Sequence, residues 1–329
     1  MPINQRHPDV LSLESRALIG NALGDPTTRS TWVYTPPNYR GEPVVGLLAL
    51  AGFSGHGPML FNQDPLGESL GSRLDRLILN GTCPPCLVAA PDCFTRLGGN
   101  QYIDSVGTGA YASHLVHEVV PAIESRYPIT KWGVVGKSSG GYGAMVLPML
   151  HPGVFHATAN HSGDANFELC YLPDALETID QVRSAGGPQA WLAKFWSSSQ
   201  RRTPKQIKTL GFLAMAAHYS PNPGIADGFD LPFSLETGEF RPDVWARWHA
   251  WDPVAMVSRH TNELRNLKLL FIDAGTNDEY GLHWGARALS SALNDHGVTH
   301  IHEEFVDGHM NIAYRFERSI PLLVNALAS

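Results

Sequence analysis

The segment Gly136-Lys137-Ser138-Ser139-Gly140 constrains the fold of this chain more than any other stretch. It directly follows the apolar run 132–135 and precedes a helical pattern. A strand that enters Gly-x-Ser-x-Gly and leaves as a helix is a nucleophile elbow, because glycines two residues from the serine leave room for a tight turn. The serine hydroxyl then projects from the end of a sheet, a position that suits attack on an acyl carbon.

A second segment, Gly67-Glu68-Ser69-Leu70-Gly71, has the same pattern, so the pattern alone does not select the nucleophile. No strand-like run precedes it. Leu66, Leu70, Leu74 and Ile78 recur every four residues, which predicts that Ser69 lies inside a helix and lacks the sharp turn. We therefore predict Ser138 as the nucleophile.

Composition limits the class of protein. The chain has 329 residues, of which 43% are hydrophobic and 17% charged, enough for one large domain or a domain with an insertion. The formal net charge of −7 and the lack of a Lys/Arg cluster argue against a nucleic-acid surface. Residues 1–23 lack the basic start and apolar stretch of a signal peptide, and no 18-residue apolar window suits a membrane span. We expect a soluble, cytoplasmic protein of undetermined oligomeric state.

The pair Cys83-Pro84-Pro85-Cys86 has the C-x-x-C form, but it precedes a predicted strand instead of opening a helix. No second ligand pair has the spacing of a zinc site. We interpret the motif as a proline-rich turn, and we expect neither a metal nor an organic cofactor.

Elsewhere short apolar runs alternate with helical patterns, as a mostly parallel sheet flanked by helices requires. Strands are predicted at 31–35, 44–51, 87–90, 132–135, 155–160, 267–272 and 301–306, the first as an antiparallel edge strand. Helices are predicted at 109–127, 141–150, 285–293 and 312–327.

The stretch 165–260 breaks this alternation. It contains five of the chain's eight tryptophans, which are Trp191, Trp196, Trp245, Trp248 and Trp251. We predict a core of residues 1–164 and 261–329, with 165–260 inserted between two late strands as a lid over the site. The alternative is a set of extra helices packed away from the site. We expect the tryptophans, with Phe94 and Tyr142, to line the substrate pocket.

A serine hydroxyl needs a base, and in this architecture the chain order is Ser, then Asp or Glu, then His. His309 follows the last predicted strand, where Gly308 allows the loop to turn, so we predict it as the base. The other candidate histidines lie in a predicted helix or strand, apart from His161, which follows a strand and is expected in the pocket.

For the acid we predict Asp278, which lies beyond the strand 267–272 and whose carboxylate would orient one imidazole nitrogen. Glu279, Asp273 and Asp164 are alternatives. Asp273 lies too close to its strand to reach over. Asp164 also follows a strand, so it is the stronger rival, and we expect it in the substrate pocket.

The tetrahedral intermediate carries a negative oxygen that needs two donors. One predicted donor is the backbone N–H of Ser139, directly after the nucleophile. The other is the N–H of Phe53, in the loop after the strand 44–51, where Gly52 lets the backbone approach closely. Gly52 and Ser54 are alternatives.

These segments together resemble the Putative esterase family of α/β-hydrolases, which includes esterase D (S-formylglutathione hydrolase), enterochelin esterases, feruloyl esterases and antigen 85 mycolyltransferases. The resemblance rests on segments 33–39, 90–92, 136–144, 161–164, 275–278 and 308–309, and it covers about 30–165 and 265–325. It implies an α/β-hydrolase fold, with the nucleophile at Ser138, the acid at Asp278, the base at His309 and an oxyanion donor at Phe53.

The chain departs from esterase D in two places. The elbow continues as Ser139-Gly140-Gly141-Tyr142-Gly143, where esterase D has Met-Gly-Gly-His-Gly, and the insertion 165–260 is foreign to esterase D. Both differences argue against glutathione thioesters as substrates. We expect a serine carboxylic-ester hydrolase acting on a small-molecule ester. The alternatives are an acyltransferase, a thioester hydrolase or a peptidase using the same site, or a non-catalytic binding protein.

Overall fold

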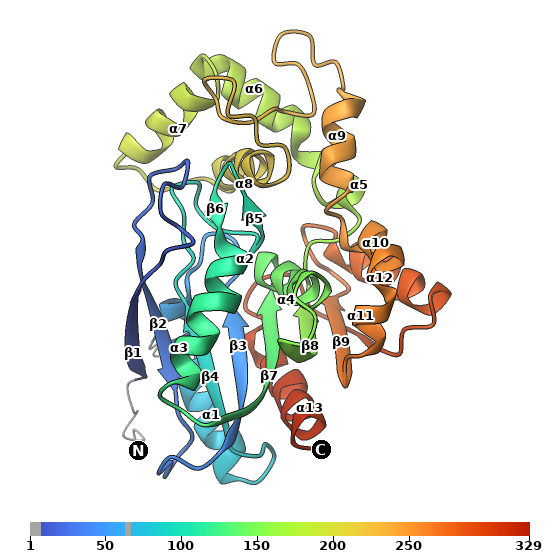
Figure 1. Ribbon diagram of the computed structural model, residues 1–329. Coiled ribbons are helices and arrows are strands. Elements are labelled where there is room, and N and C mark those ends of the chain that lie inside the picture. Colours follow the sequence, from blue (N-terminus) through green and yellow to red (C-terminus); the bar gives the residue numbers. More distant parts are fainter. Residues whose placement is uncertain (1–7, 63–66) are drawn as a thin grey trace.

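The computed structural model describes residues 8–62 and 67–329, so Leu66 of the predicted repeat lies outside the described part. Within that part, eight strands form one sheet in the order β1-β2-β4-β3-β7-β8-β9-β10 (Figure 1). The β1–β2 and β2–β4 pairs are antiparallel, and all other neighbours are parallel. The sheet strands are β1 (Asp9–Glu14), β2 (Thr28–Tyr34), β3 (Val44–Leu50), β4 (Cys86–Pro91), β7 (Ile129–Lys137), β8 (Phe155–His161), β9 (Leu269–Gly275) and β10 (Ile301–Phe305).

Helices cover both faces of this sheet, and the central strands are buried on both sides. In β3, Leu48 packs with the helices of one face, whereas Leu47 packs with those of the other. This explains why β3 reads as a continuous apolar run. The first face carries α2 (Tyr111–His114), the π-helical turn Leu115–Val119, α3 (Val120–Glu124), α4 (Ser139–Leu150) and α12 (Leu282–Asp295). The second carries α1 (Leu70–Leu79) and α13 (Phe316–Ala328), the latter preceded by the 3-10 turn Ala313–Arg315.

The segment predicted as an insertion contains further helices between β8 and β9. Helices α6, α7 and α8 lie beyond the upper end of the sheet in Figure 1. Their apolar side chains share one buried cluster with α4 and α12. The helices of this segment are α5 (Phe167–Cys170), α6 (Ala175–Ala185), α7 (Pro188–Ser197), α8 (Pro204–Tyr219), α9 (Pro242–His249) and α10 (Pro253–Met256), with 3-10 turns at Leu172–Asp174 and Val257–Arg259. Helix α11 (Thr261–Arg265) follows and leads to β9.

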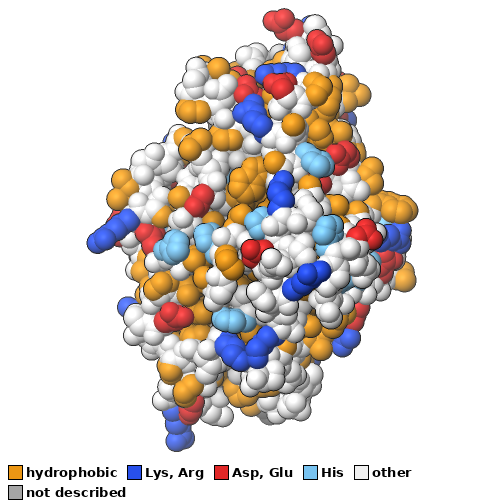
Figure 2. All heavy atoms as spheres, turned by 45° about the vertical axis from the view of Figure 1, so that its right-hand side comes forward, with side chains coloured by type: hydrophobic (Ala, Val, Ile, Leu, Met, Phe, Trp, Pro, Cys, Tyr) orange, Lys and Arg blue, Asp and Glu red, His pale blue; other side chains and the backbone are white. Residues whose placement is uncertain are grey.

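Smaller elements complete the described part. A two-stranded ribbon of β5 (Asp104–Ser105) and β6 (Gly109–Ala110) precedes α2, and a 3-10 turn spans Gly57–Phe61. Acidic and basic side chains are interspersed on the face drawn in Figure 2. Among the described helices, none is both long and apolar enough to cross a bilayer.

Two predictions about local structure were wrong. The strand at the edge of the sheet is β1. The strand predicted at the edge, β2, lies between β1 and β4 and pairs with both. Of the residues in β1 only Leu11 is buried, so its apolar signal was too weak to predict a strand. Ser69 is the N-cap of α1, where its hydroxyl accepts a hydrogen bond from Ser72 N–H at 3.2 Å, and it does not lie in the helix interior.

Candidate active site

The turn between β7 and α4 holds Ser138 in a conformation that side chains rarely adopt. Its backbone has φ 60° and ψ −128°, outside the regions favoured by residues with a Cβ. Such strain costs about 1–3 kcal/mol and persists only where the surroundings fix it. Here Ser138 N–H donates to the carbonyl of His161 at 2.9 Å, and the Ser138 carbonyl accepts from Tyr142 N–H at 2.9 Å. These two bonds hold the turn to β8 and to its own helix.

The glycines on either side of Ser138 are required by close backbone contacts. A Cβ on Gly136 would lie 2.2 Å from the carbonyl oxygen of Gly140. A Cβ on Gly140 would lie 2.1 Å from the carbonyl oxygen of Leu50, at the end of β3. Both distances are far below van der Waals contact, so the Gly-x-Ser-x-Gly pattern follows from the packing of this turn against the neighbouring strand.

His309 and Asp278 meet in the loops that follow β10 and β9. The imidazole Nδ1 lies 2.8 Å from Asp278 Oδ2, and both side chains are buried. The other carboxylate oxygen, Oδ1, accepts from Tyr280 N–H at 2.9 Å. Glu279, a rival for the acid, accepts the backbone N–H of His309 at 2.7 Å and therefore holds the loop instead of the imidazole. Among residues 8–62 and 67–329 none forms a hydrogen bond with the second imidazole nitrogen, Nε2, so this nitrogen can take up a proton.

The charge state of Asp278 suits that arrangement. Burial acts to raise the pKa of its carboxyl group. The hydrogen bond and the charge of His309, together with the N–H groups of Tyr280 and Leu282, outweigh burial and hold the pKa below its ordinary value. Asp278 is therefore an anion at neutral pH and can stabilise an imidazolium at His309.

A separate Ser-His-Asp set is buried between β8, β9 and α13. His161 Nδ1 is 2.6 Å from Asp273 Oδ1, and His161 Nε2 is 2.7 Å from the hydroxyl of Ser319 on α13. Arg315 donates to the other oxygen of Asp273 at 2.7 Å. Ser319 and Asp273 have no exposed surface and His161 has 1%, so no substrate reaches them. This set anchors β8, β9 and α13 at the strand end that holds Ser138.

Two backbone N–H groups point to an oxyanion site. Among the described residues, neither Phe53 N–H nor Ser139 N–H donates to a protein acceptor. The loop that carries Phe53 passes close to Ser138, because a Cβ on Gly52 would lie 3.2 Å from Ser138 Cβ. The Phe53 ring packs against Gly99, where an added Cβ would lie 2.4 Å from a ring carbon. These contacts fix the loop beside Ser138.

One pocket of about 670 Å³ contains these groups, a size that suits a small-molecule ligand. Ser138, Ser139, Phe53 and His309 all line it. Its apolar wall comes mainly from α8 and the segment before it. Arg201, Arg202 and Lys208 lie in or just before α8, whereas a fourth cation, Lys137, comes from the end of β7. The lining residues from 165–260 are Cys170, Tyr171, Asp174, Arg201, Arg202, Thr203, Pro204, Ile207, Lys208, Gly211, Phe212 and Met215.

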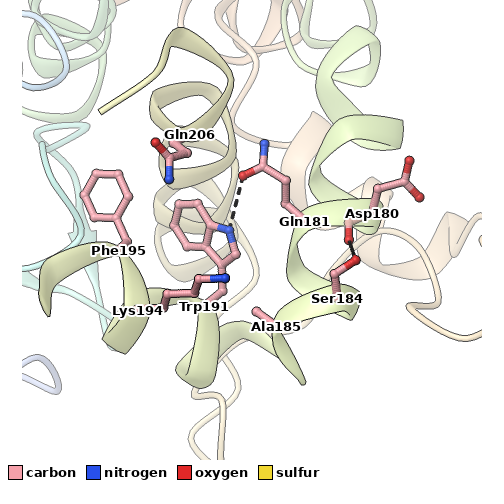
Figure 3. Close-up of a pocket in the computed structure, with 8 residues that line it drawn as sticks. All are labelled: Asp180, Gln181, Ser184, Ala185, Trp191, Lys194, Phe195 and Gln206. Atoms are coloured by element: carbon pink, nitrogen blue, oxygen red, sulfur yellow. Dashed lines mark hydrogen bonds between the residues drawn. The ribbon is translucent and has the colours of Figure 1, made fainter. Parts of the chain in front are cut away.

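Another hollow, of about 320 Å³, lies wholly within the segment 165–260, between α6, α7 and α8 (Figure 3). The indole of Trp191 lies in it, and Nε1 donates to Gln181 Oε1 at 3.3 Å. It is lined by Asp180, Gln181, Ser184, Ala185, Trp191, Lys194, Phe195 and Gln206. Neither Ser138 nor His309 reaches it, so the pocket of Ser138 is the candidate active site.

Asp164 lies in the Ser138 pocket, held by two residues that the sequence did not point to. Its Oδ2 accepts from the Tyr171 hydroxyl at 3.0 Å and from Gln101 Nε2 at 3.3 Å. Ser139 Oγ also donates to it at 3.3 Å. Gln101 comes from the loop after β4 and Tyr171 from the segment 165–260, and no spacing in the sequence relates either residue to Asp164.

The structure does not bring Phe94, Tyr142 or His161 to the Ser138 pocket. Tyr142 lies on α4 but is fully buried, packed against Phe167 with ring centroids 6.1 Å apart. Phe94 packs edge-on to His56 at 6.5 Å. The side chain of His161 turns toward Asp273 and borders a separate hollow of about 170 Å³.

The five tryptophans of 165–260 also lie away from this pocket. Trp248 has no exposed surface and stacks on Trp245 at 5.6 Å. Trp191 stacks on Phe195 at 5.2 Å, and Trp196 is exposed to solvent. These side chains build the interior and the outer surface of the segment, whereas residues of α8 line the pocket together with Ser138.

A family model described as "Putative esterase" matches residues 100–317, which is more than half of the chain. No curated protein matches the sequence. Several solved structures share its fold. A ferulic acid esterase is 17% identical with a TM-score of 0.61, over 98% of this chain and all (100%) of that one. An S-formylglutathione hydrolase from Agrobacterium tumefaciens is 14% identical with a TM-score of 0.56, over 97% and 94% of the two chains.

The Staphylococcus aureus protein FphF, a fluorophosphonate-binding serine hydrolase, is 14% identical with a TM-score of 0.57, over 96% of this chain and 98% of that one. At such low sequence identities, structural similarity shows a shared fold and nothing further. Together with the mostly parallel sheet and its flanking helices, these structures confirm the predicted α/β-hydrolase fold.

Because the carboxyl group of Asp164 is buried, we predict that it makes the free energy of unfolding depend on pH. Burial raises its pKa, and the hydrogen bonds from Tyr171, Gln101 and Ser139 offset burial only in part, as does the charge of His309. The unfolded chain releases this proton near the ordinary aspartate pKa of about 4, and the folded chain releases it only at higher pH. In that window the folded state binds more protons, so the free energy of unfolding falls as the pH rises.

Asp164→Asn removes this titration. We expect the variant to gain stability over the wild type between pH 3.5 and pH 7, measured as the difference in free energy of unfolding by urea at each pH. A difference that stays constant, or one that changes in favour of the wild type toward pH 7, would contradict the prediction.

Proposed function

Because the chain belongs to the Putative esterase family and is a carboxylesterase-type hydrolase, we propose that its reaction runs through an acyl-enzyme on Ser138. In this proposal His309 is the general base and acid, and Asp278 orients the imidazole. The observation that carries it is the shared pocket: the strained serine and the histidine line one cavity, and that histidine is held by a carboxylate at 2.8 Å.

The first half of the reaction forms the acyl-enzyme. His309 Nε2 takes the proton of Ser138 Oγ as that oxygen attacks the ester carbonyl carbon, and the carbonyl electron pair moves to the oxygen. The N–H groups of Phe53 and Ser139 stabilise the resulting oxyanion, since no protein acceptor among the described residues competes for them. When the carbon–oxygen bond to the alcohol breaks, His309 gives its proton to the departing oxygen.

Water completes the cycle by a second set of the same steps, in which water is the attacking group and Ser138 Oγ is the leaving group. His309 takes a proton from the water as it attacks the acyl carbon, and it then returns the proton to Ser138. The carboxylate of Asp278, anionic at neutral pH, stabilises the imidazolium in both halves. Transfer to an alcohol and cleavage of a thioester would pass through the same acyl-enzyme, and product analysis with an added alcohol separates transfer from hydrolysis.

We propose that residues 165–260 act as the specificity wall of this site, on a core of 1–164 and 261–329. The proposal rests on α8, which contributes Ile207, Phe212 and Met215 to the pocket. Such a wall favours esters with an apolar group on the side that faces α8. In this proposal the α8 residues, and not the predicted tryptophans, form the apolar lining of the substrate pocket.

Replacing the nucleophile tests the mechanism. We expect Ser138→Ala to lower kcat/KM for aryl ester hydrolysis by at least about a thousandfold, the size of effect usual for loss of a triad member. The matched control is Ser69→Ala, which changes the serine of the other Gly-x-Ser-x-Gly segment and removes only an N-cap, at a cost of about 1 kcal/mol in stability. Hydrolysis that survives in Ser138→Ala would place the nucleophile elsewhere.

Filling the pocket from α8 tests the specificity wall. Gly211 lines the pocket, and a Cβ built on it would lie 3.6 Å from the Phe53 ring, an ordinary contact. We expect Gly211→Leu to lower kcat/KM for esters with a bulky acyl or alcohol group at least about tenfold more than for small esters, because the leucine occupies their space. The measurement is a kinetic profile over series that lengthen the acyl half and the alcohol half separately.

Gly211→Ala is the control for folding. It adds only the tolerated Cβ, and alanine is favoured over glycine in a helix by about 1 kcal/mol, so we expect an equal or higher melting temperature. An unchanged size profile in Gly211→Leu would remove α8 from the specificity wall.

A further inference from the structure

The pocket of Ser138 contains a carboxylate, that of Asp164, which takes no part in the proposed mechanism. His309 takes its orientation from Asp278, so Asp164 is not needed as the acid of a triad. Yet Asp164 lines the pocket while only 6% of its surface is exposed. Burial of a carboxylate is unfavourable unless a partner compensates for it.

The two oxygens of Asp164 differ in their environment. Oδ2 accepts all three hydrogen bonds, from Tyr171, Gln101 and Ser139. Oδ1 accepts none from any residue in the described ranges 8–62 and 67–329, and it is not one of the atoms sealed from solvent without a partner. It is therefore the oxygen through which Asp164 meets the pocket. The bonds to Oδ2 hold the carboxylate in one orientation and leave Oδ1 without a donor among the described residues.

Two other charged groups of the lining, Asp174 and Arg202, have protein partners, and a third, Lys137, is an amine beside Ser138 whose pKa is lowered by burial. Asp174, the second acid in the lining, is paired with Lys208 at 2.8 Å. The Arg202 guanidinium donates to the backbone carbonyl of Ser198 at 2.8 Å, at the partly exposed margin. The apolar side chains of Cys170, Phe212, Met215 and Leu282 also line this pocket. A hydrogen-bond donor that enters the pocket would bind the unsatisfied acceptor of Asp164.

Asp164 also lies close to the reacting atoms. It is in hydrogen-bond contact with Ser139, which directly follows the nucleophile, and the charge of His309 affects its ionisation. A group that reaches its open oxygen therefore lies in the same pocket as Ser138 and His309, on the side of Ser139. We propose that Asp164 is a substrate-recognition residue whose open carboxylate oxygen accepts a hydrogen bond from a hydroxyl or protonated amine close to the ester bond.

This inference rests on the proposed function and names the class of ester that the site prefers: one that carries a hydrogen-bond donor next to the scissile bond on an otherwise apolar body. A site built to bind such a donor discriminates against the analogue that lacks it, because a buried polar atom is then left without a partner.

The test compares esters that differ only in the donor. One arm uses p-nitrophenyl esters of a short 3-hydroxy acid, of the matching 3-amino acid and of the unsubstituted acid. A second arm places the hydroxyl on the alcohol half, with monoesters of a diol against simple alkyl esters. The enzymes are the wild type, Asp164→Leu, which removes the acceptor, and Asp164→Asn, which keeps the shape. Asp174→Asn is the matched control, because that acid lines the same pocket but is already paired.

We expect the wild type to show kcat/KM at least about tenfold higher for the donor-bearing member of one arm, the size of effect of one hydrogen bond to a charged acceptor. Asp164→Leu should bring that ratio to about one, Asp164→Asn should give an intermediate ratio, and Asp174→Asn should keep the wild-type ratio. The 3-amino ester shows whether the site prefers an ammonium to a hydroxyl group.

A wild-type ratio near one in both arms would overturn the proposal whether or not the variants fold, and so would a ratio that persists in Asp164→Leu. In either case hydrolysis of the unsubstituted ester that depends on Ser138 leaves the proposed function standing. If no ester in either arm is hydrolysed in a Ser138-dependent way, the proposed function fails and this inference fails with it.

Discussion

The strained turn at Ser138 is the constraint on which the rest of the site depends. A backbone with φ 60° at a residue with a Cβ is retained because three neighbours leave no alternative: Gly136 touches Gly140, Gly140 touches the end of β3, and His161 accepts the serine N–H. Because the turn lies at the carboxyl end of a central parallel strand, the loops after β3, β9 and β10 reach it. Phe53, Asp278 and His309 come from those loops.

The structure contains a hydrogen-bonded Ser-His-Asp set that lies outside the candidate active site. Ser319, His161 and Asp273 are linked at 2.6 and 2.7 Å, yet they are buried and join α13 to β8 and β9. Ser138 and His309 instead line an open pocket. The backbone carbonyl of His161 also holds the turn at Ser138. Access and backbone strain distinguish Ser138 from Ser319.

Sequence patterns predicted those features that depend on strand order and local turns. The elbow and the positions of Asp278 and His309 in the loops after β9 and β10 follow from where the parallel strands end. The oxyanion role of the Phe53 N–H stays a prediction. The sequence patterns did not predict the direction in which individual side chains point. Tyr142 and His161 flank the site in the chain but turn into the core, and Asp164 meets Gln101 and Tyr171 only through long-range packing. The wall from α8 could not be predicted either. The tryptophan content of 165–260 predicted pocket residues, but tryptophans of this segment pack in its own interior.

The most direct test of this account is a crystal structure of the enzyme after reaction with a fluorophosphonate. The account predicts a phosphorus–oxygen bond to Ser138 Oγ, a phosphoryl oxygen about 3 Å from the backbone nitrogens of both Phe53 and Ser139, and the imidazole of His309 facing the adduct. Phosphorus on another residue, or a phosphoryl oxygen directed away from those two nitrogens, would contradict it.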